Sequence, residues 1–183
     1  MNQKSVFSLL FISSLLMAEP LSQEQMIQKG TEVSTALVQK LGGELKTQMQ
    51  SGGPLAALHF CSQNALSLTD QIAKESGTSV KRVSLQNRNP VNAATPEEKA
   101  VLSQWQEILK KSEALPPYKL TKLSNGHTVY YKPIVINNEA CLKCHGDIAG
   151  DSPLAKAIKE TYPEDHATGY KMGDLRGMVV VAF

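Results

Sequence analysis

The chain lacks a large net charge. Its 183 residues include 19 lysines and arginines against 17 acidic residues, which gives a formal charge of +2 with neutral histidines. A balance so close to neutral does not support binding to nucleic acid or to an anionic membrane surface, because both require a strongly basic face. The sequence also contains no internal repeat and no low-complexity tract, which excludes a repeat architecture. These absences leave a globular protein of ordinary composition.

The sequence has no apolar run of the length that spans a membrane. The N-terminal run over residues 6–17 is interrupted by serines and falls short of the roughly 20 residues that a span needs. With Lys4 before it and Ala18 after it, this run has the features of a secretory signal peptide. The residue at the −3 position is larger than ideal, which keeps an uncleaved anchor as the alternative. We predict a signal peptide over residues 1–18 and one exported, periplasmic domain over residues 19–183, without stable membrane insertion.

Cysteine is scarce, and two of the three cysteines stand in one short motif. Residues 141–145 read Cys-Leu-Lys-Cys-His, which is the attachment signature of a c-type haem. Each thiol adds to one vinyl group of the porphyrin, and the adjacent His145 binds the iron axially. Bacteria attach c-type haem on the periplasmic side, so the motif agrees with the predicted export. We predict one covalent haem c, held by Cys141 and Cys144, with His145 as an iron ligand.

Other chemistries of the same residues remain open. Cys141 and Cys144 could form a disulfide or a thioredoxin-like redox pair, although no βαβ unit is visible around them. Together with His145 and the distant Cys61, they could also build a Cys₃His zinc site. Zinc sites more often use two short ligand clusters than one cluster and a lone upstream cysteine, which favours haem.

The third cysteine, Cys61, lies on the apolar stripe of a predicted helix. It could be a small buried hydrophobic residue, or it could be the second axial ligand of the haem iron. A thiolate ligand would favour ferric iron and protect the sulfur from oxidation. Met172 competes for the same role as a thioether, and the pattern alone favours Cys61 only slightly. We expect the remaining histidines to lie at the surface or to form hydrogen bonds and not to bind the iron; they are His59, His127 and His166.

Helix signals dominate the first part of the chain. Ser22 opens a first helix with a capping box, and the Ser-Gly-Gly-Pro sequence at positions 51–54 ends it. A second helix begins at Pro54 and runs to about Ser76, where a glycine follows as the stop. A third helix follows another capping box, which begins at Thr95.

Strand signals are concentrated in the second part. Residues 118–123 and 127–136 flank an Asn-Gly pair, which predicts a hairpin with a type I′ turn. The haem motif follows this hairpin directly. The other predicted elements are a strand over residues 80–85, a short helix over residues 152–162 and a closing strand over residues 177–183. This order predicts an α+β fold in which the cofactor segment is inserted before the last strand.

Several segments, in this order, resemble a known family. The chain is similar to the Tll-type c-type haem domains, which occur as secreted single-domain proteins and as extracytoplasmic parts of bacterial sensor kinases. The resemblance covers nearly the whole chain after residue 18. The matching segments are 60–65 (FCSQNA), 82–85 (RVSL), 88–90 (RNP), 131–134 (YKPI), 141–146 (CLKCHG), 167–170 (ATGY) and 173–177 (GDLRG).

The resemblance implies a PAS-like antiparallel sheet with N-terminal and flanking helices around one covalent haem. It also implies His/Cys axial ligation of the iron, which maps onto His145 and Cys61 and resolves the choice against Met172. Since no kinase or signalling domain follows Phe183, we expect a sensing role to act through a separate protein.

The chain has only three arginines. Arginine suits bidentate pairing with carboxylates, and haem brings two propionates that need such partners. We predict that one or two of Arg82, Arg88 and Arg176 meet the propionates, with a structural salt bridge or a loop anchor as the alternative role for each.

For function, we expect a redox or diatomic-ligand sensor. A haem with both axial positions filled has no open site, so a gas binds only after a ligand leaves, and reduction favours loss of a thiolate. The alternative is a soluble periplasmic electron-transfer cytochrome, which would carry single electrons without ligand exchange. We do not expect an enzyme, because the sequence supplies no distal acid–base pair.

Overall fold

The computed structural model describes residues 20–183, so the predicted signal peptide lies outside the described residues. Its elements confirm the predicted α+β class. They are, in chain order, α1 (Gln23–Ser76), β1 (Ser79–Val83), η1 (Pro90–Asn92), α2 (Pro96–Lys110), β2 (Lys119–Lys122), β3 (Thr128–Val135), α3 (Glu139–His145), α4 (Pro153–Thr161) and β4 (Leu175–Ala182). None of the helices in this range is both long enough and apolar enough to cross a membrane.

A four-stranded antiparallel sheet forms the centre of the molecule, with strand order β1-β4-β3-β2. The last strand, β4 (Leu175–Ala182), lies between β1 (Ser79–Val83) and β3 (Thr128–Val135), and β2 (Lys119–Lys122) lies outside β3. Val135 of β3 pairs with Leu175 of β4, so the excursion between these strands leaves and re-enters the sheet at the same end. This excursion carries the Cys-Leu-Lys-Cys-His motif.

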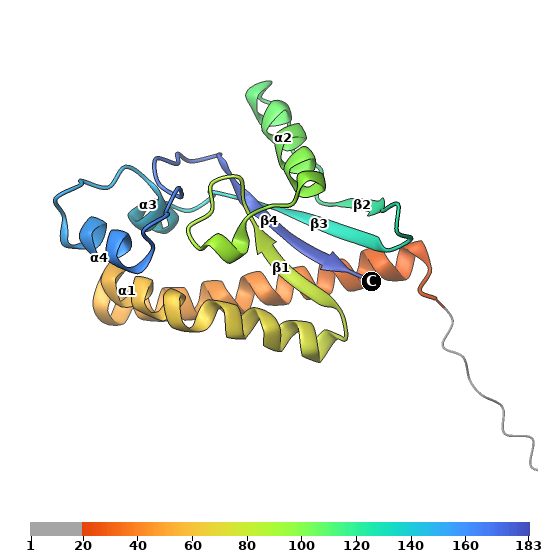
Figure 1. The fold of residues 1–183 in the computed structure, drawn as a ribbon, viewed down its shortest axis with the longest axis horizontal. Helices are drawn as coiled ribbons and strands as arrows, with labels where there is room; N and C mark the ends of the chain where they lie inside the picture. The colour runs from red at the N-terminus through yellow and green to blue at the C-terminus, as the bar shows by residue number, and fades with distance from the viewer. Residues whose placement is uncertain (1–19) are drawn as a thin grey trace, which may run out of the picture.

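The first helical element, α1 (Gln23–Ser76), is a helical hairpin. Its N-cap is Ser22 in the predicted capping box, and its C-cap is Gly77 at φ 65°. Gly53 has non-helical angles (φ 68°, ψ −160°), and Figure 1 shows the chain doubling back at this point. Pro54 then opens the second arm. The two helices predicted before and after residues 51–54 are therefore confirmed as the two arms of α1.

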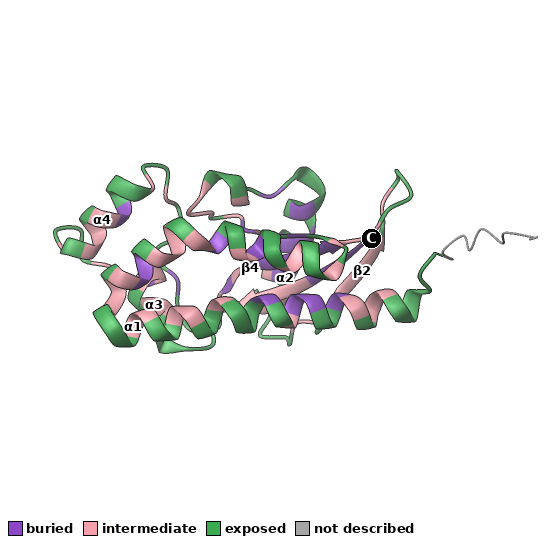
Figure 2. Cartoon of the chain, turned by 90° about the horizontal axis from the view of Figure 1, so that it is seen from below, coloured by how far each residue is buried: buried purple, intermediate pink, exposed green. Residues whose placement is uncertain are grey.

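The sheet is covered by α1 on one face and by α2 (Pro96–Lys110) on the other (Figure 1). A hydrophobic core lies on each face of the sheet. Successive side chains of β4 point to opposite faces, so Met178 packs in the core on the α2 side and Val179 in the core on the α1 side. Figure 2 shows buried stretches on both arms of α1, separated by exposed residues. The α2 side of the core contains Val83, Ala94, Val101, Leu102, Trp105, Val129, Tyr131, Leu175, Met178 and Val180.

The β2–β3 hairpin is confirmed, but the predicted type I′ turn is wrong. Gly126 N donates to Leu123 O (3.0 Å), and Leu123 N donates to His127 O (2.8 Å). Gly126 has φ 88°, whereas Asn125 is not among the described residues with positive φ. A three-residue loop of this kind combines a type I turn with a glycine bulge. The Asn-Gly pair indicated the correct place for the hairpin. In a type I′ turn these two residues would occupy the two central positions, whereas here each lies one position later.

Several boundaries differ from the sequence prediction; the closing strand, for example, begins at Leu175 instead of residue 177. The predicted strand over residues 80–85 ends at Val83, because the Ser84 hydroxyl donates to Arg176 O (2.7 Å) and accepts from Gln86 N (3.1 Å). The haem motif, for which no secondary structure was predicted, forms a short helix.

Close approach between α1 and the sheet gives a testable prediction. An added Cβ at Gly30 would lie 2.6 Å from Cδ2 and 2.8 Å from Cδ1 of Tyr130, which is fully buried. We expect Gly30→Ala to lower the free energy of unfolding by about 1–3 kcal/mol, because the ring has no free space to move into.

Gly43→Ala is the matched control in the same helix. It meets no atom within 4 Å and should raise stability by up to about 1 kcal/mol. Urea denaturation midpoints that shift in the same direction for both variants would contradict this account.

Candidate functional site

The motif lies on α3 (Glu139–His145), a seven-residue helix directly after β3. Its N-cap is Asn138, whose side-chain oxygen accepts from Ala140 N (2.8 Å). Helical spacing places residues three and four positions apart on one face. Cys141 therefore shares a face with Cys144 and with His145.

All three cysteines are free, half-buried thiols. Burial raises the pKa of Cys144, against the lowering effect of the positive charge of Arg88. Cys141 and Cys144 are not joined by a disulfide in the structure, which leaves both sulfurs for other bonds. No group of three or more His, Cys, Asp or Glu side chains within residues 20–183 is arranged to hold a metal ion, so the Cys₃His zinc geometry is not present there.

The His145 ring is held in a defined tautomer. Its Nδ1 lies 2.7 Å from Ala167 O, and because a carbonyl can only accept, Nδ1 carries the proton. The Nε2 lone pair is then free for a metal. Burial lowers the pKa of His145 to about 3, and the charges of Arg176 and Arg88 add to this effect. A neutral imidazole with a fixed tautomer is what axial ligation of iron requires.

The loop after α4 (Pro153–Thr161) folds back along α3 and completes the site. Tyr170 N donates to His145 O (2.9 Å), and Gly169 N donates to Gly146 O (2.9 Å). The Tyr170 ring stands edge-on to His145, with centroids 6.2 Å apart and an interplanar angle of 83°. This loop carries the Ala-Thr-Gly-Tyr segment of residues 167–170.

The structure brings Cys61 to the same end of the molecule. It lies on the second arm of α1, which contacts both α3 and α4 (Figure 1). Cys61 and Cys144 are close enough for their charges to affect each other. Burial raises the pKa of the Cys61 thiol, against the charges of Arg82 and Arg88. Met172, the competing candidate, is half exposed in a loop.

The three arginines have different surroundings. Arg176 donates from Nη1 to Ser84 Oγ (3.0 Å) and to Gln86 O (3.1 Å), and its guanidinium carbon lies 5.3 Å from the Tyr170 ring centre. Arg88 also bonds to protein groups. Both therefore act as loop anchors.

Arg82 differs because its buried Nε has no hydrogen-bond partner among the described residues. Its Nη2 makes one long bond, to Ala65 O (3.4 Å). A buried N–H without a partner costs about 1–3 kcal/mol, so such a group normally marks a place for a bound acceptor. Arg82 lies near Cys61, where a haem propionate would satisfy it. The residues present therefore fit a covalent haem at this site.

The large aromatic residues contribute to the core. Trp105 and Tyr131 pack on the α2 side of the sheet, and Tyr130 packs on the α1 side. Sequence reasoning missed Asp165 and the carbonyl of Ala167, which contact the motif region through Arg88 and His145. A backbone carbonyl has no side-chain signature, so only the 167–170 segment could have pointed to it.

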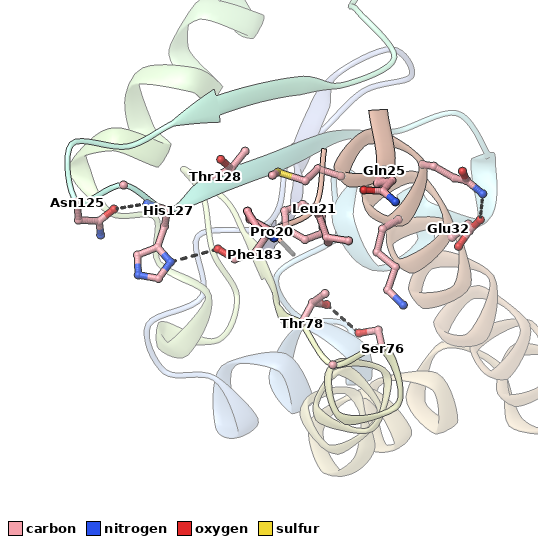
Figure 3. A pocket seen from close by; sticks show the side chains of 15 residues that line it. Pro20, Leu21, Gln25, Glu32, Ser76, Thr78, Asn125, His127, Thr128 and Phe183 are labelled. Atoms are coloured by element: carbon pink, nitrogen blue, oxygen red, sulfur yellow. Dashed lines mark hydrogen bonds between the residues drawn. The ribbon is translucent and has the colours of Figure 1, made fainter. Parts of the chain in front are cut away.

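A pocket of about 910 Å³ lies at the other end of the molecule (Figure 3). It is lined by the start of α1, the β2–β3 turn and Phe183, whose carbonyl lies 3.1 Å from His127 Nδ1. A smaller pocket of about 360 Å³, lined by Ser62 and Tyr162 among others, lies beside Cys61. None of the motif residues lines either pocket, so the larger one is separate from the candidate site.

Comparisons with known proteins bear on the family and on the fold. A family model described as Tll0287-like matches residues 16–183. The crystal structure of the cyanobacterial heme-protein Tll0287 is similar, with a TM-score of 0.69 and 25% sequence identity, and the match covers 88% of this chain and 96% of that chain. The search of curated proteins found no match.

Proposed function

The chain belongs to the Tll0287-like family, and from this premise we propose that it is a periplasmic c-type haem protein that senses redox state or a diatomic ligand. The observation that carries the proposal is the position of Cys141, Cys144 and His145 on one face of α3, at the end of the molecule where α1, which carries Cys61, contacts α3 and α4. The solved relative is a heme-protein, which supports haem as the ligand here.

Each residue of the site has a defined task in this proposal. Cys141 and Cys144 would form the thioethers, and the free Nε2 of His145 would bind one side of the iron. Cys61 Sγ would bind the other side, and Arg82 Nε would donate to a propionate. A haem held in this way would supply one-electron chemistry and, after one axial ligand has left, a position for a diatomic gas.

The proposed sensing role is supported by the different parts of the fold that carry His145 and Cys61. His145 is tied to the Ala167 carbonyl within a loop that is itself hydrogen-bonded to α3. Cys61 lies on α1, which packs against β1, β3 and β4 and therefore against most of one sheet face. Release of Cys61 would act on this long helix, and a separate redox or signalling protein could respond to its movement.

Absorption spectra of the haem-loaded protein test the proposal. We expect protein made in the periplasm with haem-maturation factors to show a low-spin ferric spectrum with thiolate charge-transfer bands. Cys61→Ala should remove these bands completely, whereas His59→Ala and Met172→Leu should keep them, since both residues are exposed. Carbon monoxide should shift the spectrum of the ferrous wild-type protein.

Two results would contradict the proposal, the first its sensing role and the second its ligand assignment. If the ferrous protein keeps its Cys61 ligand and does not respond to carbon monoxide, the chain is an electron-transfer cytochrome. If Cys61→Ala leaves the ferric bands unchanged while Met172→Leu removes them, the second ligand is Met172.

A further inference from the structure

Arg88 forms a buried ion pair with Asp165 at the candidate site. Arg88 lies in the loop between β1 and the short helix η1 (Pro90–Asn92). Its Nε donates to Asp165 Oδ1 and its Nη2 to Asp165 Oδ2, both at 3.1 Å. The two side chains are only 11% and 8% exposed, so solvent weakens this fork little.

The same guanidinium contacts two backbone carbonyls next to His145, one from the preceding residue and one from the loop that accepts from the ring. Arg88 Nη2 also donates to Cys144 O (2.7 Å) and to Ala167 O (3.3 Å). The Ala167 carbonyl is the acceptor of His145 Nδ1. Asp165 Oδ1 accepts from Ala167 N (2.8 Å), so the ion pair holds both polar groups of this residue.

We propose that the Arg88–Asp165 pair is a positioning device for His145, and that it controls the imidazole through the shared Ala167 carbonyl. The proposal rests on the proposed function, in which His145 binds the iron. Partners of the second ring nitrogen set the orientation and basicity of a ligating histidine. Here that partner is a fully buried carbonyl, which also accepts a long, shared hydrogen bond (3.3 Å) from Arg88 Nη2, while the N–H of the same residue donates to Asp165 Oδ1 (2.8 Å).

This role differs from the propionate contact that the sequence suggests for Arg88. Its Nε and Nη2 already donate to Asp165, Cys144 and Ala167, and Nη1 makes no hydrogen bond among the described residues. Arg82 differs, because its buried Nε has no partner among these residues. The positioning role of Arg88 therefore rests on Nε and Nη2 and does not depend on a propionate.

Arg88→Lys in the haem-loaded protein tests the proposal. Lysine keeps the positive charge but cannot bond to the carboxylate and to two carbonyls in the same planar fork. The Ala167 carbonyl then accepts from His145 alone, which makes the imidazole a stronger donor. We expect the haem content to stay close to that of the wild type, and the g-values of the ferric electron paramagnetic resonance spectrum to shift. The ratio of ferric to ferrous protein at a fixed ambient potential should rise several-fold.

Glu98→Gln is the matched control. The buried carboxylate of Glu98 pairs with the partly exposed Lys81 (2.8 Å) between α2 and β1, away from the motif. This variant should lower the melting temperature but leave the resonance spectrum and the ferric-to-ferrous ratio unchanged. If Arg88→Lys behaves in the same way, Arg88 has only a structural role and the proposal is overturned.

The two proposals can fail separately. Absence of covalent haem from the wild-type protein, or a spectrum that does not depend on His145, contradicts the proposed function and removes the basis of the positioning role. A His145-dependent spectrum that Arg88→Lys leaves unaltered contradicts the positioning role alone.

Discussion

Replacement of both Cys141 and Cys144 by serine is expected to abolish covalent haem completely. A hydroxyl does not form the thioether that links each cysteine to a vinyl group, and both sulfurs are free in the structure. Haem staining after denaturing electrophoresis should show a band for the wild-type chain and none for the double variant. The pyridine haemochrome spectrum should change from the c-type to the b-type position in any haem that remains.

Cys61→Ser is the control for this experiment. It removes a thiol from the same end of the molecule, yet Cys61 lies outside the attachment motif, on α1. The variant should keep its covalent haem while the axial-ligand bands change. A haem stain retained by the double variant would show that the motif does not attach the cofactor.

Loss of the Trp105 side chain should have the largest effect on the stability of the fold. Trp105 is 1% exposed and belongs to the α2 side of the core, with Leu102, Tyr131 and Met178. Removal of a fully buried aromatic ring costs about 3–5 kcal/mol, because the cavity is filled only in part. A domain of this size has a total stability of about 5–15 kcal/mol, so Trp105→Ala should be close to the limit of folding.

Urea denaturation followed by circular dichroism measures this effect. Ser103→Ala, an exposed position in the same helix, should stay within about 0.5 kcal/mol of the wild type. Equal midpoints for Trp105→Ala and Ser103→Ala would show that α2 contributes little to the core.

Local chemistry made the helix ends predictable. The capping boxes at Ser22 and Thr95 and the glycine after Ser76 each depend on residues within a few positions, and all three are found as expected. The turn type of the β2–β3 hairpin was not predictable in the same way. It depends on how the two strands align, which an Asn-Gly pair does not determine alone.

In the candidate site, too, the features that depend on local sequence were predictable and those that depend on tertiary contacts were not. The spacing of Cys141, Cys144 and His145 can be read directly from the sequence, and the family resemblance, now confirmed, indicated Cys61. The acceptor of the His145 ring could not be read, because it is a backbone carbonyl in a loop that only the tertiary structure brings back to α3. The Arg88–Asp165 pair joins residues 77 positions apart, and nothing local in the sequence indicates that these two residues pair.

The excursion between β3 and β4 has a consequence for the order of assembly. Two backbone hydrogen bonds close its base, from Ile136 N to Asp174 O (2.9 Å) and from Gly173 N to Ile136 O (2.8 Å). Because both ends of the excursion meet there, it can open as a local unit while β3 and β4 stay paired. If the thiols take a covalent haem as proposed, attachment could therefore occur on a chain whose sheet has already formed, and it would not have to precede folding.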